Sequence, residues 1–355
     1  MSPLVEHTPL PTFRCLRERG QEVLPLERAL QQDIRELHVG FLNMMPDAAF
    51  RVTEQQFMRL VGNSNQIAQF YVHPFTIPGL PRSEDILRYV ERFYTTFDEL
   101  RRDGLDALII TGANVTQPDL EREPFYGPLT EIVEWAAEHV TSVLTSCLGT
   151  HILMQHSYNT KRQRLPEKRW GVFEHRLAQP DHPLLRDINT RFDVPHSRYN
   201  EISREQFEQT GMTILVDSPE AGVHMAVSPD QFRRVFFQGH PEYDINSLLK
   251  EYKREVMLYL HGERDRPPFP DKYFTPEAQA IADAYIEHAL SVRGKNGGLP
   301  PFPEEDILPL LDNTWGDTSK AVFNNWLGLV YQLTHVDRHI LFVDGVDPDN
   351  PLGLL

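Results

Sequence analysis

A near-continuous apolar run at residues 104–110 constrains the fold of this chain most strongly. The run reads Gly-Leu-Asp-Ala-Leu-Ile-Ile and is closed by Thr111-Gly-Ala-Asn114. A strand without polar alternation is typical of a parallel sheet whose two faces are both covered by helices. Ligands bind such sheets beside the carboxyl ends of the strands. Residues 111–114 are therefore a candidate ligand-binding loop.

Strand and helix patterns alternate around this run. The periodicity predicts strands at 36–43, 140–146, 212–216 and 235–237, and helices at 53–61, 83–97, 131–139, 148–156, 246–260, 277–292 and 319–332. Thr53 is the expected N-cap of its helix. Alternation of this kind predicts an α/β fold with a doubly wound, mostly parallel, flavodoxin-like sheet flanked by helices.

The remaining segments suggest one domain with additions at both ends. Residues 1–33 read as an irregular, proline-punctuated arm, and residues 34–355 as a single domain with a helical C-terminal extension from about residue 264. Residues 157–230 are less regular and are expected to add further strands and long loops. Within them, the basic segment 161–169 is expected to be a solvated loop; the alternative is that it faces a phosphate-bearing substrate.

Charge and cysteine content limit the partners and the compartment. The chain has 355 residues, a formal net charge of −16 and only two cysteines, Cys15 and Cys147. The negative charge argues against nucleic acid or an anionic membrane as a partner, and no apolar run is long enough to span a bilayer. Two cysteines make a disulfide framework unexpected, so we expect a reducing, cytoplasmic location. Metal binding is not expected, because neither a paired-cysteine motif nor His-Glu-x-x-His occurs.

Cys147 has the surroundings of a catalytic nucleophile. It ends the β-branched run Val140-Thr-Ser-Val-Leu-Thr-Ser and precedes a predicted helix, as in a nucleophile elbow. A second predicted strand leads to Gly-His240-Pro-Glu242, which offers a base and a carboxylate to orient it. The backbone N–H of Leu148 is the expected oxyanion donor, with a second donor from residues 45–47 or 111–114.

These motifs resemble two known families. The elbow and the Gly-His-Pro-Glu segment resemble class I glutamine amidotransferases, which use a Cys-His-Glu triad. A much longer series of matches is similar to the homoserine O-succinyltransferase family, which is built on the same amidotransferase-like fold. These matches include Leu42-Asn-Met-Met-Pro46, Thr53-Glu-Gln-Gln-Phe-Met-Arg-Leu60, Asp106-Ala-Leu-Ile-Ile-Thr-Gly-Ala113, Gly171-Val-Phe-Glu-His175, Pro195-His-Ser-Arg-Tyr199, Gly239-His-Pro-Glu-Tyr-Asp244, Glu251-Tyr252 and Asn325-Trp-Leu327.

The longer resemblance implies an acyl transfer in two steps. Cys147 would take a succinyl group from succinyl-coenzyme A, and His240 would then deprotonate the attacking hydroxyl of L-homoserine, in the first committed step of methionine biosynthesis. Lys168, Ser197 and Arg254 match the family's substrate-contacting positions, and a guanidinium suits an amino-acid carboxylate. The resemblance also implies a homodimer and no bound cofactor.

This chain departs from the family at three positions. Asp47 follows the Leu-Asn-x-Met-Pro segment where basic residues are common, and the loop there is expected to be about two residues longer. Leu148 replaces the usual tryptophan. Thr116 occupies the position associated with acyl choice; as a neutral residue it does not repel a succinyl carboxylate, which favours succinyl over acetyl. An acetyl donor, a serine acceptor, a glutamine amidohydrolase subunit and a catalytically idle interaction protein remain the alternatives.

Overall fold

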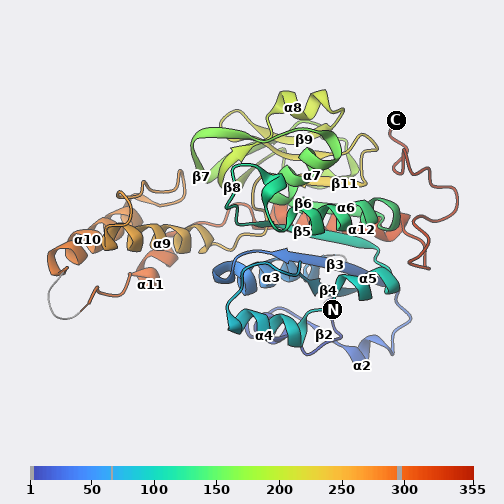
Figure 1. The fold of residues 1–355 in the computed structure, drawn as a ribbon, viewed down its shortest axis with the longest axis horizontal. Coiled ribbons are helices and arrows are strands. Elements are labelled where there is room, and N and C mark those ends of the chain that lie inside the picture. Colours follow the sequence, from blue (N-terminus) through green and yellow to red (C-terminus); the bar gives the residue numbers. More distant parts are fainter. Residues whose placement is uncertain (1–3, 65–66, 294–297) are drawn as a thin grey trace.

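The computed structural model describes residues 4–64, 67–293 and 298–355, and a large mixed sheet forms its centre (Figure 1). Within the described residues this sheet has nine strands. In spatial order they are β4 (Gln69–Phe75), β3 (Glu36–Met44), β5 (Ala107–Ala113), β6 (Ser142–Ser146), β11 (Arg234–Phe237), β10 (Gly222–Val227), β9 (Thr213–Ser218), β7 (Gln163–Leu177) and β8 (Arg191–Glu201).

The first five of these strands are parallel. Their order along the chain is 2-1-3-4-5, which is the order of a flavodoxin-like doubly wound sheet. The predicted fold class is thus confirmed. The other four strands pair antiparallel with their neighbours, so the sheet is parallel in one half and antiparallel in the other.

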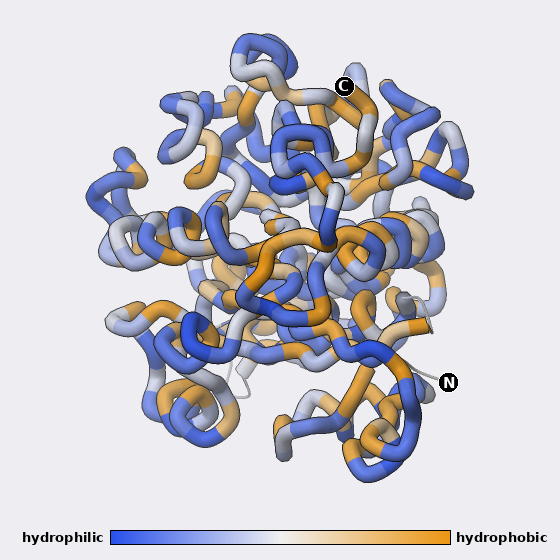
Figure 2. The backbone as a smooth tube through the Cα atoms, turned by 90° about the vertical axis from the view of Figure 1, so that its right-hand side faces the viewer, coloured by the Kyte–Doolittle hydropathy of each residue, from blue (hydrophilic) through white to orange (hydrophobic). Residues whose placement is uncertain are grey.

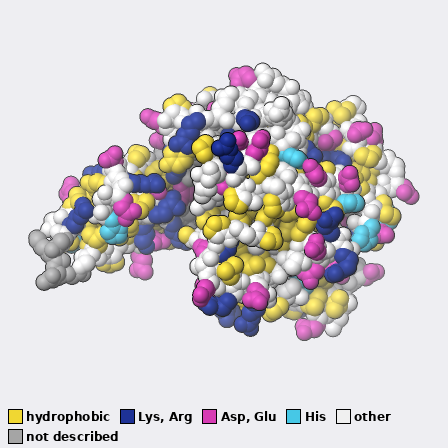
Figure 3. Space-filling model, viewed as in Figure 1, with side chains coloured by type: hydrophobic (Ala, Val, Ile, Leu, Met, Phe, Trp, Pro, Cys, Tyr) yellow, Lys and Arg dark blue, Asp and Glu magenta, His cyan; other side chains and the backbone are white. Residues whose placement is uncertain are grey.

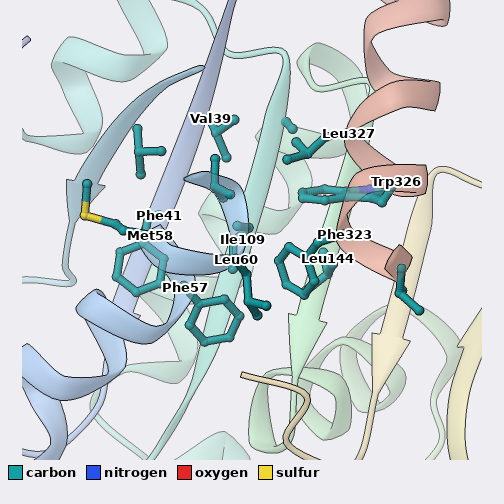
Figure 4. Packing of buried hydrophobic residues seen from close by; sticks show 14 of the residues in the cluster. Val39, Phe41, Phe57, Met58, Leu60, Ile109, Leu144, Phe323, Trp326 and Leu327 are labelled. Carbon is teal, nitrogen blue, oxygen red and sulfur yellow. The ribbon is translucent and has the colours of Figure 1, made fainter. Parts of the chain in front are cut away.

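Helices cover both faces of the parallel half. One face is covered by α1 (Pro11–Glu18), α3 (Asp47–Gly62), α4 (Glu84–Phe93) and α12 (Gly316–Leu333). The other is covered by α5 (Phe97–Asp103), α6 (Tyr126–His139) and α7 (Leu148–Tyr158), while α8 (Arg204–Gln209) packs beside the antiparallel strands β9 and β10. Alternate strand residues serve the two faces: Ile109 packs with α3 and α12, whereas Leu108 and Ile110 pack on the opposite side (Figure 4).

A helical lobe projects from one end of the sheet (Figure 1). It contains α9 (Ser247–His261), α10 (Pro276–Val292) and α11 (Glu304–Ile307), which share an apolar cluster with Trp170 and Val172 of β7. The helices predicted at 246–260 and 277–292 are confirmed. The chain then returns to the main body, where α12 packs against α3. Hydrophobic segments run through the middle of the molecule, and the outer loops are mainly hydrophilic (Figure 2).

Four local predictions were wrong. The N-terminal arm is regular: besides α1 it contains β1 (Val5–Glu6), β2 (Leu24–Pro25) and α2 (Leu26–Ala29). Thr53 does not cap its helix, because α3 begins at Asp47 directly after Pro46. The helix predicted at 83–97 ends at Phe93, and α5 starts anew behind a capping box made by Thr96 and Glu99.

The fourth error concerns the basic segment 161–169. Most of it belongs to the long strand β7, which pairs with β8 across the region predicted to be less regular. Three short 3-10 turns complete the secondary structure: η1 (Leu120–Arg122), η2 (Pro183–Leu185) and η3 (Leu308–Leu310). Among the helices of the described residues, none is both long and apolar enough to cross a membrane.

Candidate active site

Cys147 lies in a strained turn between β6 and α7. Its backbone has φ +51° and ψ −112°, a conformation that residues other than glycine adopt rarely. The turn is held because the N–H of Cys147 donates to the carbonyl of Phe237 at 2.8 Å. Strain of this kind is typical of nucleophile elbows, where it presents the side chain at the start of a helix.

The parallel register brings His240 and Glu242 to this turn. Ser146 of β6 is aligned with Phe237 of β11, so the loops that follow the two strands are neighbours. On one side, the imidazole of His240 interacts electrostatically with Cys147. On the other side, His240 Nδ1 lies 2.8 Å from Glu242 Oε1. The structure therefore brings the three predicted triad residues together in the expected order.

Neighbouring groups fix the imidazole and favour its charge. The His240 ring stacks on Tyr243 with 4.3 Å between the ring centroids. The backbone N–H of His240 donates to the carbonyl of Pro195 at 2.8 Å. Burial alone would lower the pKa of His240, but the negative charges of Glu242 and Cys147 raise it well above its usual value. A protonated imidazole beside the sulfur favours the thiolate, which is the nucleophilic form.

The end of β5, within residues 111–114, is the better placed of the two predicted sources of a second oxyanion donor. A side chain on Gly112 would lie 3.7 Å from both the Cβ of Cys147 and the backbone N of Leu148, so this end of the strand packs directly against the elbow. Residues 45–47 have other partners: the Met45 N–H donates to Asn43, and the carboxylate of Asp47 accepts from the Ser83 N–H at 2.7 Å. Asp47 also begins α3, so the longer loop predicted there is instead the first turn of a helix.

Cys147 opens into a cavity of about 1160 Å³. Its lining is strongly basic although the chain is acidic overall. Lys and Arg side chains also gather on the surface where the helical lobe meets the main body (Figure 3). The basic residues of the lining are Lys161, Arg162, Arg164, Lys168, Arg198, Arg254 and Arg264.

Glu251 on α9 accepts hydrogen bonds from several residues on one side of this cavity. Its Oε2 accepts from the Ser197 hydroxyl at 2.6 Å and from Lys168 Nζ at 3.3 Å, while its Oε1 accepts from the Tyr243 hydroxyl at 2.8 Å. Burial alone would raise the pKa of Glu251, but Lys168 and the donated hydrogen bonds bring it below the usual value. Two predicted substrate contacts, Lys168 and Ser197, thus meet on one carboxylate.

Arg254 lines the same cavity at its rim. Its side chain is 61% exposed, and its guanidinium lies 3.1 Å from Glu255. The same carboxylate holds Arg264 at 2.7 Å. The structure therefore brings Arg254 to the same cavity as Lys168 and Ser197, although its ion pair is with a different carboxylate.

Thr116 also lines the cavity, with its polar groups already bonded. The Thr116 N–H donates to Glu123 Oε1 at 2.5 Å, and its hydroxyl lies 3.2 Å from Glu123 Oε2. The Gln117 N–H adds a further bond at 2.6 Å, so a buried carboxylate fixes this loop. We did not predict the contacts of Glu251, Tyr243 or Glu123, although Glu251 and Tyr243 lie in stretches that matched the family. Arg162 belongs to the basic segment 161–169, for which a position facing the substrate was the alternative, and it lines the cavity.

Comparisons with known proteins identify the family of similar chains. The family model for homoserine O-succinyltransferase matches residues 3–336. The chain is 60% identical to the homoserine O-succinyltransferase of Methylococcus capsulatus and 57% identical to that of Nitrosococcus oceani, with 99% of each chain covered in both cases. Among solved structures, a glutamine amidotransferase from Thermotoga maritima has a TM-score of 0.44 and 13% identity, covering 83% of this chain and 97% of its own.

Proposed function

This chain belongs to the homoserine O-succinyltransferase family, a family of acyltransferases, and from that premise we propose that it transfers a succinyl group from succinyl-coenzyme A to the hydroxyl of L-homoserine. The observation that carries the proposal is the Cys147–His240–Glu242 constellation at the end of a basic cavity. A thioester of coenzyme A brings phosphate groups, and a cavity lined by arginine and lysine suits them.

In the first half-reaction, the thiolate of Cys147 attacks the carbonyl carbon of the thioester. The backbone N–H of Leu148, at the start of α7, is placed to stabilise the oxyanion, with a second donor from residues 111–114. The carbon–sulfur bond to coenzyme A then breaks, and His240 gives its proton to the departing thiolate. Cys147 keeps the acyl group.

In the second half-reaction, His240 accepts the proton of the homoserine hydroxyl as its oxygen attacks the acyl-enzyme. The bond between the acyl group and Cys147 breaks, which releases the ester and restores the thiolate and imidazolium. Glu242 orients the imidazole and stabilises its charged form throughout. Lys168, Ser197 and Arg254 are proposed contacts of the amino acid, with Arg254 suited to its carboxylate.

One experiment tests the proposal against the alternatives. The protein is incubated separately with succinyl-coenzyme A, acetyl-coenzyme A and glutamine, and Cys147 is analysed for an adduct by mass spectrometry. We expect acylation by succinyl-coenzyme A, its discharge by homoserine in preference to serine, and no adduct in Cys147→Ala. Turnover of glutamine without acylation by either thioester would contradict the proposal, and so would a fully active Cys147→Ala protein.

A further inference from the structure

Most of the basic residues that line the cavity are already held by partners. Arg198 is buried and donates to the carbonyls of Asn200 and Ala221. The others are held by acidic or aromatic side chains: Lys168 by Glu251, Arg254 and Arg264 by Glu255, and Arg164 against the ring of Tyr199 at 4.6 Å. Lys161 and Arg162 remain.

Arg162 is the one of these two whose charge interacts with the nucleophile. It lies between α7 and β7, is partly buried, and interacts electrostatically with both Cys147 and Glu123. Within the described part of the chain, no carboxylate lies within ion-pair distance of its guanidinium. Arginine stays protonated in proteins, so the cavity holds near the thiol a positive charge that is not engaged in a salt bridge.

Because of Glu123, an acyl chain that ends in a carboxylate needs a positive charge such as that of Arg162 in this cavity. Its buried carboxylate is bonded to Thr116 and Gln117, so a fixed negative charge lies behind the loop that lines the cavity beside Cys147. An acyl chain ending in a carboxylate would be repelled there unless a cation faced it. The hydroxyl of Thr116 is engaged by the same carboxylate and cannot supply that attraction.

We propose that Arg162 binds the free carboxylate of the succinyl group while the thioester carbonyl lies at Cys147. In succinate the two end carbons are separated by three single bonds, roughly 4 Å when extended. One group can therefore react with the thiol while the other meets a guanidinium that lines the same cavity. The planar fork of arginine binds a carboxylate through two hydrogen bonds. This role rests on the proposed function and assigns donor selection to Arg162.

Two thioesters of equal length test the proposal. Butyryl-coenzyme A has the four-carbon chain of the succinyl donor but ends in a methyl group. We expect Arg162→Gln to lower kcat/KM for succinyl-coenzyme A by roughly 10- to 100-fold, because charge-assisted hydrogen bonds are lost. The same substitution should lower kcat/KM for butyryl-coenzyme A by a clearly smaller factor, because that donor loses only the effect of the positive charge near the thiol. Arg164→Gln is the control: it removes an equal charge from the lining of the same cavity and should change kcat/KM for the two donors by equal factors.

The possible results distinguish a failure of the role proposed for Arg162 from a failure of the proposed acyltransferase function. Equal losses with both thioesters in Arg162→Gln would assign the residue to coenzyme A or to folding and overturn the proposal, and so would an unchanged succinyl rate. Arg162→Lys keeps a charge without the fork and should retain part of the succinyl preference, which keeps the test decisive if the glutamine variant is unstable. A wild-type protein acylated by neither thioester would instead overturn the proposed function.

Discussion

At the scale of single residues, Glu251 links the amino-acid side of the cavity to the triad. It accepts from Lys168 and Ser197, and through Tyr243 it reaches the ring that stacks on His240. A substrate that contacts Lys168 or Ser197 must therefore share them with this carboxylate. Contacts at Lys168 or Ser197 and the position of the His240 imidazole are thus connected by one side chain.

We predict that Glu242→Gln lowers kcat by about 10²- to 10⁴-fold, as loss of the third triad member does in related arrangements. The substitution removes the charge that offsets the burial of His240, so the pKa of His240 falls and the thiolate loses its counter-charge. Alkylation of Cys147 by iodoacetamide at pH 7 should slow at least about tenfold, and the difference should shrink above about pH 8.5, where solvent deprotonates a thiol.

Mass spectrometry of the two cysteine peptides measures this effect. Cys15 lies in α1 and provides an internal reference whose alkylation should not change. Equal alkylation of Cys147 in the wild type and in Glu242→Gln across this pH range would show that Glu242 does not act through the imidazole.

The triad could be predicted because each member follows a strand that is recognisable in the sequence. Cys147 ends a β-branched run, and His240 and Glu242 follow another strand within a few residues. The contacts of Glu251 and Glu123 could not be predicted in this way. They depend on which side chains from distant elements meet in space, and local periodicity carries no information about that.

At the scale of elements, the contact between β7 and the lobe depends on Gly171. This residue has φ +150°, and a Cβ there would lie 2.3 Å from the carbonyl oxygen of Asp271 and 2.5 Å from its nitrogen. Asp271 exchanges backbone hydrogen bonds with Trp170 and Val172 at 2.8 and 2.9 Å. The segment between α9 and α10 is thereby attached to the sheet.

Gly171→Ala should lower the free energy of unfolding by about 2–4 kcal/mol, because the new methyl group meets rigid backbone in an unfavourable conformation. Gly79→Ala is the matched control: its φ is +81°, but no atom lies within 4 Å of an added Cβ. It should cost only about 1 kcal/mol. Urea denaturation compares the two, and equal losses would mean that the contact with Asp271 contributes nothing.

Elements with strong periodicity were predicted well, and those set by long-range pairing were not. The helices at 246–260, 277–292 and 319–332 agree with α9, α10 and α12 to within a few residues. β7 was partly mistaken for a loop because its first residues are basic and do not alternate with apolar ones. Pairing with β8 makes that segment a strand, and the partner lies some distance along the chain.

At the scale of the whole molecule, α12 completes the core beneath the catalytic strand. Phe323, Trp326 and Leu327 are fully buried against the sheet, beside Ile109 and Leu144 (Figure 4). The indole N–H of Trp326 also donates to the Ser142 hydroxyl at 2.9 Å. The alternation of strands and helices predicted the fold class, but no local pattern indicated which face α12 would cover.

Trp326→Ala should therefore destabilise the protein by about 3–5 kcal/mol, the usual cost of removing a large buried aromatic side chain. Lys320→Ala, on an exposed part of the same helix, should change stability by less than about 0.5 kcal/mol. Chemical denaturation followed by far-ultraviolet circular dichroism gives the free energy of unfolding of both variants. A loss below about 1 kcal/mol for Trp326→Ala would contradict the role assigned to α12.

The late position of α12 in the chain has a consequence for biosynthesis. The ribosome makes the nucleophile turn and its histidine loop well before residues 316–333, yet the core on one face of β3, β5 and β6 is completed only when those last residues dock. Until then the nascent chain exposes a broad hydrophobic surface of the kind that chaperones bind. A translation product cut short before residue 316 would carry all three triad residues and still leave this part of the core uncovered.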